Sequence, residues 1–296
     1  MGNRRLGTKR LESVLDNMLS HSTLNGLNGS PFSIRNPDRI YLEEFFKRRP
    51  SLNADLTNAT EATRMVANPD WELLGSSGGG AVATGDATFD GPTGLLKLNL
   101  DATDQDAVTL FPHQDSNQSK WAVAGMWGSE NQVEFECLIR TGDNIATQTI
   151  FAGLKLADDS GNNYAYATDS DQVCFWYSTD DTEGAFTTNA NLHCIVSSGG
   201  DDYISDLGIE LASDTNYRLG ITFDAQRRPS AWVNGVQYSL TSATTAGGVT
   251  TGVGTVKGPA LADDKDLFPT AGIVARDAAA RHMYVGYFKC SRIVFE

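Results

Sequence analysis

The chain has 296 residues, a formal net charge of −14, 29 glycines and four cysteines. This length can bury a large core, and a single all-β domain can hold about 200–250 residues. No apolar run reaches the ~18–20 residues that a membrane-spanning helix needs, and the first residues lack the apolar stretch of a secretory signal. We therefore expect a protein that is neither inserted into a membrane nor exported across one.

Positive charge is concentrated in the first part of the chain. Residues 1–50 hold nine Lys and Arg against five Asp and Glu, a net charge of +4, which leaves −18 on residues 51–296. A basic segment ahead of an acidic body indicates that the two parts face different partners, while the charge of the body alone is typical of a soluble domain. Nucleic acid is not the expected partner, because the acidic body would repel phosphate.

Two amphipathic helices are predicted within this basic arm. Apolar residues recur at helical spacing over residues 11–19, and a second helix over 36–49 has Pro37 in its first position. Such helices either pack on the body or insert into a neighbouring subunit, and both alternatives stay open. The residues expected to bind a partner are basic or apolar members of the arm: Arg4, Arg5, Lys9, Arg10, Leu11, Leu15, Tyr41, Phe45 and Phe46.

The arm is predicted to extend to residue 74. Residues 51–74 suit a third helix or an extended strap, and the Gly/Ser-rich stretch at 75–80 suits a flexible hinge. The predicted organisation is therefore an arm at 1–74, a hinge at 75–80 and a β-sandwich at 81–296. The end of the arm, Trp71-Glu72-Leu73-Leu74, is also compatible with the first strand of the sandwich.

The body contains short strands separated by turn residues. The clearest signal is a hairpin, in which Tyr217, Leu219, Ile221 and Phe223 alternate with other residues before an Asn234-Gly235 turn. Two stacked antiparallel sheets are expected, with a long loop at 241–266. The predicted strands are 81–90, 94–100, 106–112, 131–140, 148–156, 163–168, 172–178, 191–197, 215–224, 230–240, 270–276 and 281–295.

The hairpin pattern Tyr-x-Leu-x-Ile-x-Phe-Asp followed by Trp-Val-Asn-Gly resembles the concanavalin A-like jelly rolls, which include laminin G-like and pentraxin-like domains. The resemblance covers roughly residues 85–296. It implies a mostly β, antiparallel jelly-roll sandwich with a helical or extended N-terminal arm. It implies no single function, because this fold includes lectins, glycanases and structural modules.

Four further stretches resemble virion structural proteins of marine tailed bacteriophages. They are residues 1–11 (Met-Gly-Asn-Arg-Arg-Leu-Gly-Thr-Lys-Arg-Leu), 62–75, 111–121 and 133–142. The resemblance implies a component of a virion that is assembled in the host cytoplasm. Our first hypothesis is a capsid decoration or cement protein, present as many copies, whose arm docks on capsid or tail proteins. The alternatives are a tail or fibre adhesin that binds host-surface glycans, and a glycan-cleaving depolymerase.

An enzymatic role is not predicted. Laminarinase-like glycanases of this fold carry Glu-x-Asp-x-Glu or Glu-x-Asp-x-x-Glu on one strand, which places the carboxylates on one face. The nearest match starts at Glu134 and Glu136, but Leu138 and Ile139 occupy the two positions for the last acid. The proton donor is therefore missing, and the two glutamates suit either solvated surface charge or an ion-pair site.

Glycan binding without catalysis remains open. Sugar sites of jelly rolls use exposed aromatic rings together with Asp and Asn, and strand 172–178 contains Phe175-Trp176-Tyr177. The candidate glycan-binding residues are Trp176, Tyr177, Asp180 and Asp181, with Trp121, Trp127 and Trp232 as further aromatic candidates. Most of these rings are expected in the core.

No cofactor is expected from the cysteines, because Cys137, Cys174, Cys194 and Cys290 lack zinc-ligand spacing and suit buried free thiols. His193 and Cys194 should point to opposite faces of one strand, which argues against a Cys–His couple. Calcium remains an alternative at the oxygen-rich stretches 158–163, 180–181 and 201–202, although none has EF-hand spacing and each also suits a turn.

Overall fold

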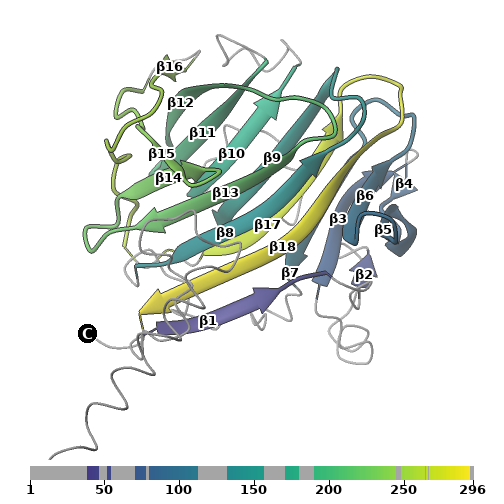
Figure 1. Ribbon diagram of the computed structural model, residues 1–296, viewed down its shortest axis with the longest axis horizontal. Helices are drawn as coiled ribbons and strands as arrows, with labels where there is room; N and C mark the ends of the chain where they lie inside the picture. Colours follow the sequence, from purple (N-terminus) through teal and green to yellow (C-terminus); the bar gives the residue numbers. More distant parts are fainter. Residues whose placement is uncertain are drawn as a thin grey trace, which may run out of the picture.

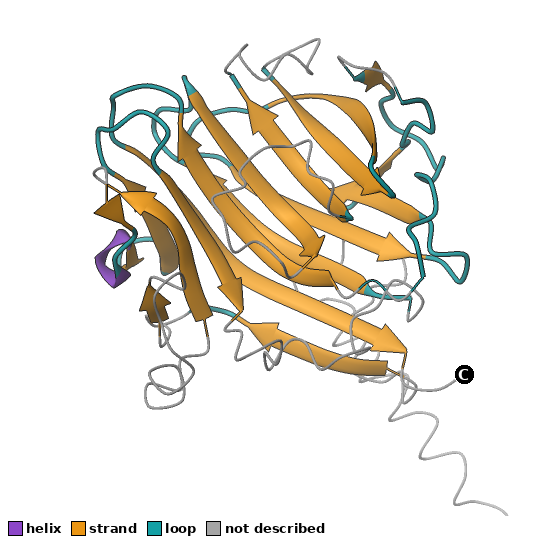
Figure 2. Ribbon diagram, turned by 180° about the vertical axis from the view of Figure 1, so that it is seen from behind, coloured by secondary structure: helices purple, strands orange, loops and turns teal. Residues whose placement is uncertain are grey.

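The computed structural model describes residues 39–46, 52–54, 71–77, 80–112, 132–156, 171–179, 190–244, 248–263, 265 and 267–293. These residues form two sheets packed face to face, with one short 3-10 turn at Thr84–Asp86 (Figure 1, Figure 2). The predicted, mostly antiparallel β-sandwich is confirmed. Within the described residues, no helix is long and apolar enough to cross a membrane.

The first sheet, here called sheet A, has the strand order β15-β14-β13-β8-β18-β6-β5, and β1 pairs with the second half of β18. Its strands are β15 (Val236–Tyr238), β14 (Pro229–Val233), β13 (Asn216–Phe223), β8 (Glu134–Thr141), β18 (Arg281–Ile293), β6 (Leu95–Leu100), β5 (Ala87–Asp90) and β1 (Arg39–Glu44). Figure 1 shows β1 and β18 lying side by side along one edge.

The second sheet, sheet B, has the order β16-β12-β11-β10-β9-β17-β7-β3-β2, and β4 pairs with β3. Its strands are β16 (Val249–Thr250), β12 (Asp201–Glu210), β11 (Asn191–Ser198), β10 (Gln172–Ser178), β9 (Gln148–Leu156), β17 (Leu267–Ala275), β7 (Ala107–Pro112), β3 (Trp71–Ser77), β2 (Leu52–Ala54) and β4 (Gly80–Ala81). Two of its pairings, β12 with β16 and β2 with β3, are parallel.

The β13–β14–β15 region folds as its sequence predicts. The four alternating apolar side chains of β13 are buried between the sheets. Asn234 and Gly235 both have positive φ, 50° and 84°, which is the conformation that a type I′ turn requires. The side chain of Asn234 also accepts a hydrogen bond from the backbone N–H of Arg218 at 2.9 Å. The expected hairpin is therefore confirmed.

The helix predicted over 36–49 is wrong in its described part. Arg39–Glu44 is strand β1, paired antiparallel with β18 from Arg39 opposite Ile293 to Glu44 opposite Phe288. Just after this strand, Phe46 is fully buried, with its ring centroid 5.2 Å from that of Trp71 and 5.7 Å from that of Phe288. Pairing with β18 and burial of Phe46 stabilise a strand here, because tertiary contacts override weak local helix propensity.

Strands that precede residue 75 belong to both sheets. Trp71 and Leu73 of β3 are buried in the core, and of the stretch predicted as a hinge at 75–80, residues 75–77 belong to β3 and Gly80 begins β4. The predicted helix over 11–19 and the arm residues Arg4, Arg5, Lys9, Arg10, Leu11 and Leu15 lie outside the described residues, as does the strand predicted at 163–168. Strand β12 was missed because its first residues, Asp201 and Asp202, resemble a turn, and the short strands β2 and β16 were also not predicted, since β16 lies in the expected loop at 241–266.

The four cysteines are buried free thiols, as predicted. Burial raises the pKa of Cys174 to about 12, and the pKa values of the other three thiols are also raised by burial. Raised pKa values leave these thiols protonated and unreactive at neutral pH. They therefore act as small apolar side chains.

Candidate functional site

The outer face of sheet B carries a second apolar cluster, separate from the core between the sheets. One row crosses four strands, because Asp206 lies opposite His193, His193 opposite Trp176, and Trp176 opposite Phe151. The rings of Phe151 and Trp176 stack with centroids 5.3 Å apart. All four side chains are at most 1% exposed, so this row is closed and Trp176 presents no ring face to a sugar.

His193 and Asp206 form the polar end of this row. The carboxylate of Asp206 accepts hydrogen bonds from Asn191 Nδ2 at 2.9 Å and from the backbone N–H of Gly208 at 2.8 Å. Burial lowers the pKa of His193, an effect that the charge of Asp206 opposes. Cys194 belongs to the core between the sheets, so it lies on the opposite face from His193, as the strand alternation predicts.

Tyr177, the second aromatic candidate for glycan binding, also has no exposed ring face. It lies in the core between the sheets, where its hydroxyl donates to the carbonyl of Ile145 at 3.3 Å. Trp232 is half-buried on the outer face of sheet A, and its Nε1 donates to Thr222 Oγ1 at 3.3 Å. The remaining candidates lie outside the described residues: Trp121, Trp127, Asp180 and Asp181.

Glu134 and Glu136 lie on the outer face of sheet A. Glu136 is 0% exposed and accepts a hydrogen bond from the hydroxyl of Tyr287 at 2.6 Å, whereas Glu134 accepts one from Ser291 at 2.9 Å. Burial raises the pKa of Glu136, although the bond from Tyr287 opposes this shift. Solvated surface charge is therefore the wrong description of Glu136, because Tyr287 and Lys289 of β18 pack beside it and an ion-pair site fits it better.

Lys289 lies between two carboxylates on neighbouring strands. It is opposite Glu136 on β8 and opposite Glu43 on β1, with Nζ 3.6 Å from Glu43 Oε1. The ring centroids of Phe45 and Tyr287 lie 4.7 and 5.2 Å from Nζ. Lys289 is 0% exposed, and burial lowers its pKa. These contacts hold β1 and Phe45 on the chain's own sandwich, while the burial of Phe46 leaves no face of that ring for a partner.

A group of polar side chains nearer the start of β18 is half open to solvent. Tyr284 lies opposite Arg140 on β8 and opposite Lys97 on β6. The guanidinium carbon of Arg140 is 5.7 Å, and Nζ of Lys97 6.0 Å, from the ring centroid of Tyr284. His282 meets the same ring edge-on, with centroids 5.3 Å apart. We call Lys97, Arg140, His282 and Tyr284 the Tyr284 cluster.

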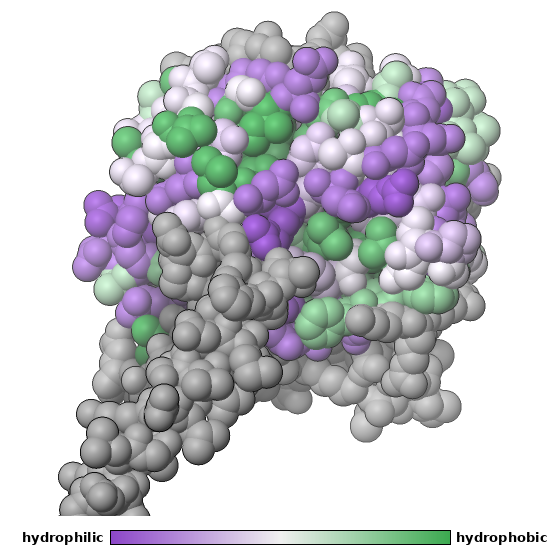
Figure 3. Space-filling model, in the orientation of Figure 1, coloured by the Kyte–Doolittle hydropathy of each residue, from purple (hydrophilic) through white to green (hydrophobic). Residues whose placement is uncertain are grey.

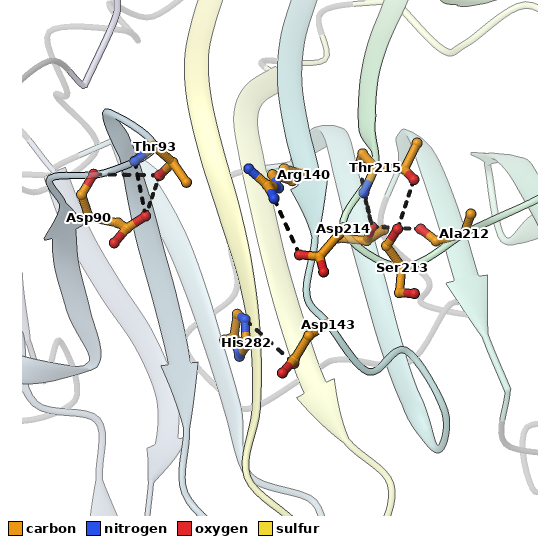
Figure 4. Close-up of polar contacts among 10 residues, drawn as sticks. Asp90, Thr93, Arg140, Asp143, Ala212, Ser213, Asp214, Thr215 and His282 are labelled. Carbon is orange, nitrogen blue, oxygen red and sulfur yellow. Dashed lines mark hydrogen bonds and ion pairs between the residues drawn. The ribbon is translucent and has the colours of Figure 1, made fainter.

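Three aspartates lie near this cluster, and Figure 4 shows Asp214 beside Arg140, Asp143 beside His282 and Asp90 beside Thr93. Asp214 Oδ1 lies 3.3 Å from Arg140 Nη2, and Asp143 Oδ1 lies 3.8 Å from His282 Nε2. The side chains of Asp143 and Asp214 are 76% and 57% exposed. Asp90, which also binds the N–H of the nearby Thr93, adds its negative charge from β5. Carboxylates and cationic donors therefore alternate around one aromatic ring at an accessible surface.

The protonation states in the cluster follow from its surroundings. Burial lowers the pKa of His282, and the charge of Lys97 lowers it further, while Asp143 opposes both effects. Burial and the charge of Asp90 raise the pKa of Tyr284, which Arg140 opposes. At neutral pH the cluster therefore contains two cations, a neutral imidazole and a neutral phenol.

Hydrogen bonds at the end of β8 fix the loop that carries Asp214. Thr141 Oγ1 donates to the carbonyl of Ala212 at 2.7 Å and accepts from the N–H of Thr215 at 2.9 Å. Asp214 lies between these two hydrogen-bonded residues and has a positive φ of 51°, a conformation that Asp tolerates better than most residues. The loop therefore holds the Asp214 carboxylate toward the guanidinium of Arg140.

A bulge in β18 determines which side chains share the outer face. The register shifts between Val285 and Tyr287, so that Tyr284 and Tyr287 both point outward although they are three residues apart. A Cβ on the intervening Gly286 would lie 2.7 Å from Leu138 Cδ2, so that the side chain of Leu138 would have to shift. Because of the bulge, Tyr284 of the half-open cluster and Tyr287, which packs beside the buried Glu136, lie on the same outer face of sheet A.

None of the Tyr284 cluster was among the predicted site residues. The signal in the sequence is the alternation His282-Met283-Tyr284-Val285, in which Met283 and Val285 are buried and the other two face outward. That alternation identifies outward residues of one strand. It does not reveal that Arg140 and Lys97 lie beside them, because this depends on the register of three strands distant in sequence.

Metal-ligating side chains do not converge in the part of the chain that the structure describes, where no group of three or more His, Cys, Asp or Glu could hold an ion. Of the oxygen-rich stretches, Asp201 and Asp202 begin β12, and Asp202 accepts a hydrogen bond from Ser197. The stretches at 158–163 and 180–181 lie outside the described residues.

No protein-family model and no curated protein matches the sequence. Among solved structures, the chain is similar to an immunostimulatory antigen and pseudo β-1,3-glucanase of Mycobacterium tuberculosis, with 9% identity, 86% of this chain and 98% of that chain covered, and a TM-score of 0.50. A protein of unknown function from Shewanella oneidensis has 12% identity, coverage of 86% and 87%, and a TM-score of 0.47. A family 16 endo-glucanase from Bacteroides ovatus has 9% identity, coverage of 84% and 99%, and a TM-score of 0.46.

A likeness at 9% identity shows a common fold and nothing about activity. With two packed, mainly antiparallel sheets in the observed order, the chain is a concanavalin A-like jelly roll, as the hairpin pattern predicted.

Proposed function

We propose that this jelly roll binds carbohydrate at the Tyr284 cluster and does not cleave it, which corresponds to the adhesin alternative among the sequence hypotheses. The observation that carries the proposal is a half-open group of aromatic, cationic and carboxylate side chains on an outer face of the sandwich. Hydroxyl groups of sugars need donors and acceptors placed close together, and the cluster with its aspartates supplies both. The solved structures support the proposal only through the fold.

Binding without hydrolysis is the favoured form because the two glutamates of the glycanase-like stretch, Glu134 and Glu136, are already engaged. Hydrolysis of a glycosidic bond uses two carboxyl groups that flank the substrate. Glu136 is buried against Tyr287, and Glu134 is held by Ser291. The positions at which the related glycanase motif has its last acid hold Leu138 and Ile139, and Ile139 lies in the core.

The experiment is a glycan array with the full chain, followed by titration calorimetry on the glycan that binds best. The substitution Tyr284→Ala is expected to weaken binding at least tenfold, because it removes the ring that positions Arg140 and Lys97. Tyr238→Ala is the matched control, because Tyr238 is a half-buried tyrosine on β15, at the opposite edge of sheet A. Absence of binding to every glycan, or equal binding by Tyr284→Ala, would contradict the proposal.

A second proposal concerns the place of the protein, which the phage resemblance suggests. We infer that the basic residues before β1 attach the jelly roll to a capsid or tail, either as a decoration protein or as the support of the adhesin, with several copies per particle. The observation in favour is the net charge of +4 on residues 1–50 against −18 on the remainder. The test is a truncation of residues 1–36, which spares β1 and should abolish occupancy on purified particles without unfolding the sandwich. Normal occupancy would contradict attachment through this segment.

A further inference from the structure

We propose, on the basis of the proposed function, that the glycan bound at the Tyr284 cluster is acidic, and that its carboxylate or sulfate groups are received by the row Arg140–Tyr284–Lys97. The three residues occupy directly opposite positions on β8, β18 and β6. Neighbouring strands lie about 4.8 Å apart, so the row presents guanidinium, phenol and ammonium groups at a regular spacing. All three groups are hydrogen-bond donors at neutral pH, and two of them are cations.

The surroundings of the ring favour an anion over stacking with a neutral sugar. Both cations lie within about 6 Å of the Tyr284 centroid, at 5.7 Å for Arg140 and 6.0 Å for Lys97, and they come from the strands on its two sides. The ring is therefore already in contact with cations of its own chain, while its hydroxyl lies at the half-open surface. A carboxylate or sulfate can accept hydrogen bonds from adjacent donors of this row, whereas a neutral hydroxyl can satisfy fewer of them.

Neither cation is saturated by the aspartates nearby. Asp214 contacts Arg140 through one nitrogen, Nη2, at 3.3 Å, so the pair is not bidentate. Lys97 forms no ion pair within the described part of the chain. Asp143 and Asp214 are more than half exposed, so that water and salt screen their charges more strongly than the half-buried charge of Arg140. The half-buried carboxylate of Asp90 accepts hydrogen bonds from the N–H and the hydroxyl of Thr93.

The net charge of the protein makes local recognition necessary. A chain with a net charge of −14 repels polyanions at long range, so non-specific attraction does not explain binding of an acidic glycan. Binding must then depend on Arg140 and Lys97, and removal of the competing carboxylate of Asp214 should strengthen it. This gain of affinity is not expected if the cluster only stabilises the fold.

The experiment compares three oligosaccharides of equal length by titration calorimetry with the full chain: one of uronic acids, one sulfated and one neutral. We expect at least one acidic oligosaccharide to bind tenfold or more tightly than the neutral one. Lys97→Gln and Arg140→Gln should each weaken acidic binding about tenfold and change neutral binding less than threefold. Asp214→Asn should strengthen acidic binding two- to fivefold. The two acidic ligands distinguish a carboxylate site from a sulfate site.

The outcomes separate this inference from the proposed function. If the neutral oligosaccharide binds as tightly as the acidic ones and Lys97→Gln changes nothing, the acidic specificity is wrong while glycan binding stands. If no acidic oligosaccharide binds to the wild-type chain, the acidic specificity is wrong, and glycan binding itself is wrong only if every glycan of the array also fails to bind. A thermal melt of each variant shows whether it is folded. If a variant does not fold, the affinity of the wild type is measured at increasing salt concentration instead. Binding of the acidic oligosaccharide must then weaken with salt, and binding of the neutral one must not.

Discussion

The outer faces of the two sheets differ although both lie on the outside of one sandwich. On sheet B the outward side chains of six adjacent strands, from β12 to β7, form a closed apolar cluster, in which Phe151 and Trp176 stack and are at most 1% exposed. On sheet A most outward side chains of β8 and β18 are polar, and those around Tyr284 remain half open. Figure 3 shows hydrophilic residues in a broad band across one face, beside smaller apolar patches. Of the two outer faces, that of sheet A is therefore the one with accessible polar side chains among the described residues.

The largest effect is expected from truncation. Both sheets contain strands that precede residue 75, and removal of residues 1–74 deletes β1, β2 and most of β3 together with the core residues Phe46, Trp71 and Leu73. We expect this variant to lose cooperative thermal unfolding by circular dichroism, whereas removal of residues 1–36 should preserve it. A cooperatively folded fragment 75–296 would show that these strands are not part of the sandwich.

A pair of tryptophan substitutions compares the two faces directly. Trp176→Ala on sheet B should lower the free energy of unfolding by about 3–5 kcal/mol, because it opens a cavity beside Phe151 in a fully buried cluster. Trp232→Ala on the outer face of sheet A should cost about 1 kcal/mol, because Trp232 is only half-buried. Urea unfolding measures both values, and similar losses would mean that the faces do not differ in burial.

A pair of lysine substitutions tests the boundary between the buried and the open part of sheet A. Lys289→Met should cost about 3 kcal/mol, because it leaves the carboxylates of Glu43 and Glu136 without the cation between them. Lys97→Met, on the half-open part of the same face, should change stability by less than about 0.5 kcal/mol. Equal effects in urea unfolding would show that Lys289 contributes no more than a surface charge.

The smallest effects are expected from pH. Burial raises the pKa of Glu136 above its ordinary value of 4.5, so at pH values between the two the folded state binds more protons than the unfolded state. The free energy of unfolding therefore falls as pH rises from 4.5 through the raised pKa, and Glu136→Gln should remove that fall.

The opposite sign holds for Asp224, where hydrogen bonds from Lys257 and Arg228 outweigh burial and hold the pKa at about 2, below its ordinary value of 3.8. Its contribution is present above pH ~4 and is lost as pH falls toward 2, so Asp224→Asn should flatten that acid limb in urea titrations. Unchanged pH profiles in both variants would contradict these assignments.

The existence of most strands was predictable from the sequence, including β10 at 172–178, but the direction of their side chains was predictable only where one face is exposed. In β13 the alternation of Tyr217, Leu219, Ile221 and Phe223 with other residues identifies the inward face. In β10 all seven residues, Gln172–Ser178, are buried, so the sequence offers no contrast between the faces. The second cluster on sheet B could not be predicted for this reason.

Contacts between distant parts of the chain account for the other failures. β1 was predicted as a helix because its short apolar run fits both periods, and only pairing with β18 decides between them. The Tyr284 cluster was missed because it combines outward residues from β6, β8 and β18, which become neighbours only through strand register. The absence of the last acid of the glycanase motif, after Glu136, could be recognised from the sequence, since the motif depends on consecutive residues of one strand.

Amide hydrogen exchange with and without an acidic oligosaccharide tests the difference between the two faces most directly. The account predicts that ligand slows exchange in β6, β8 and the first part of β18, around Lys97, Arg140 and Tyr284, and leaves β9, β10 and β11 unchanged. Protection confined to β9–β11 would contradict it, because the glycan would then bind at the face that we describe as closed.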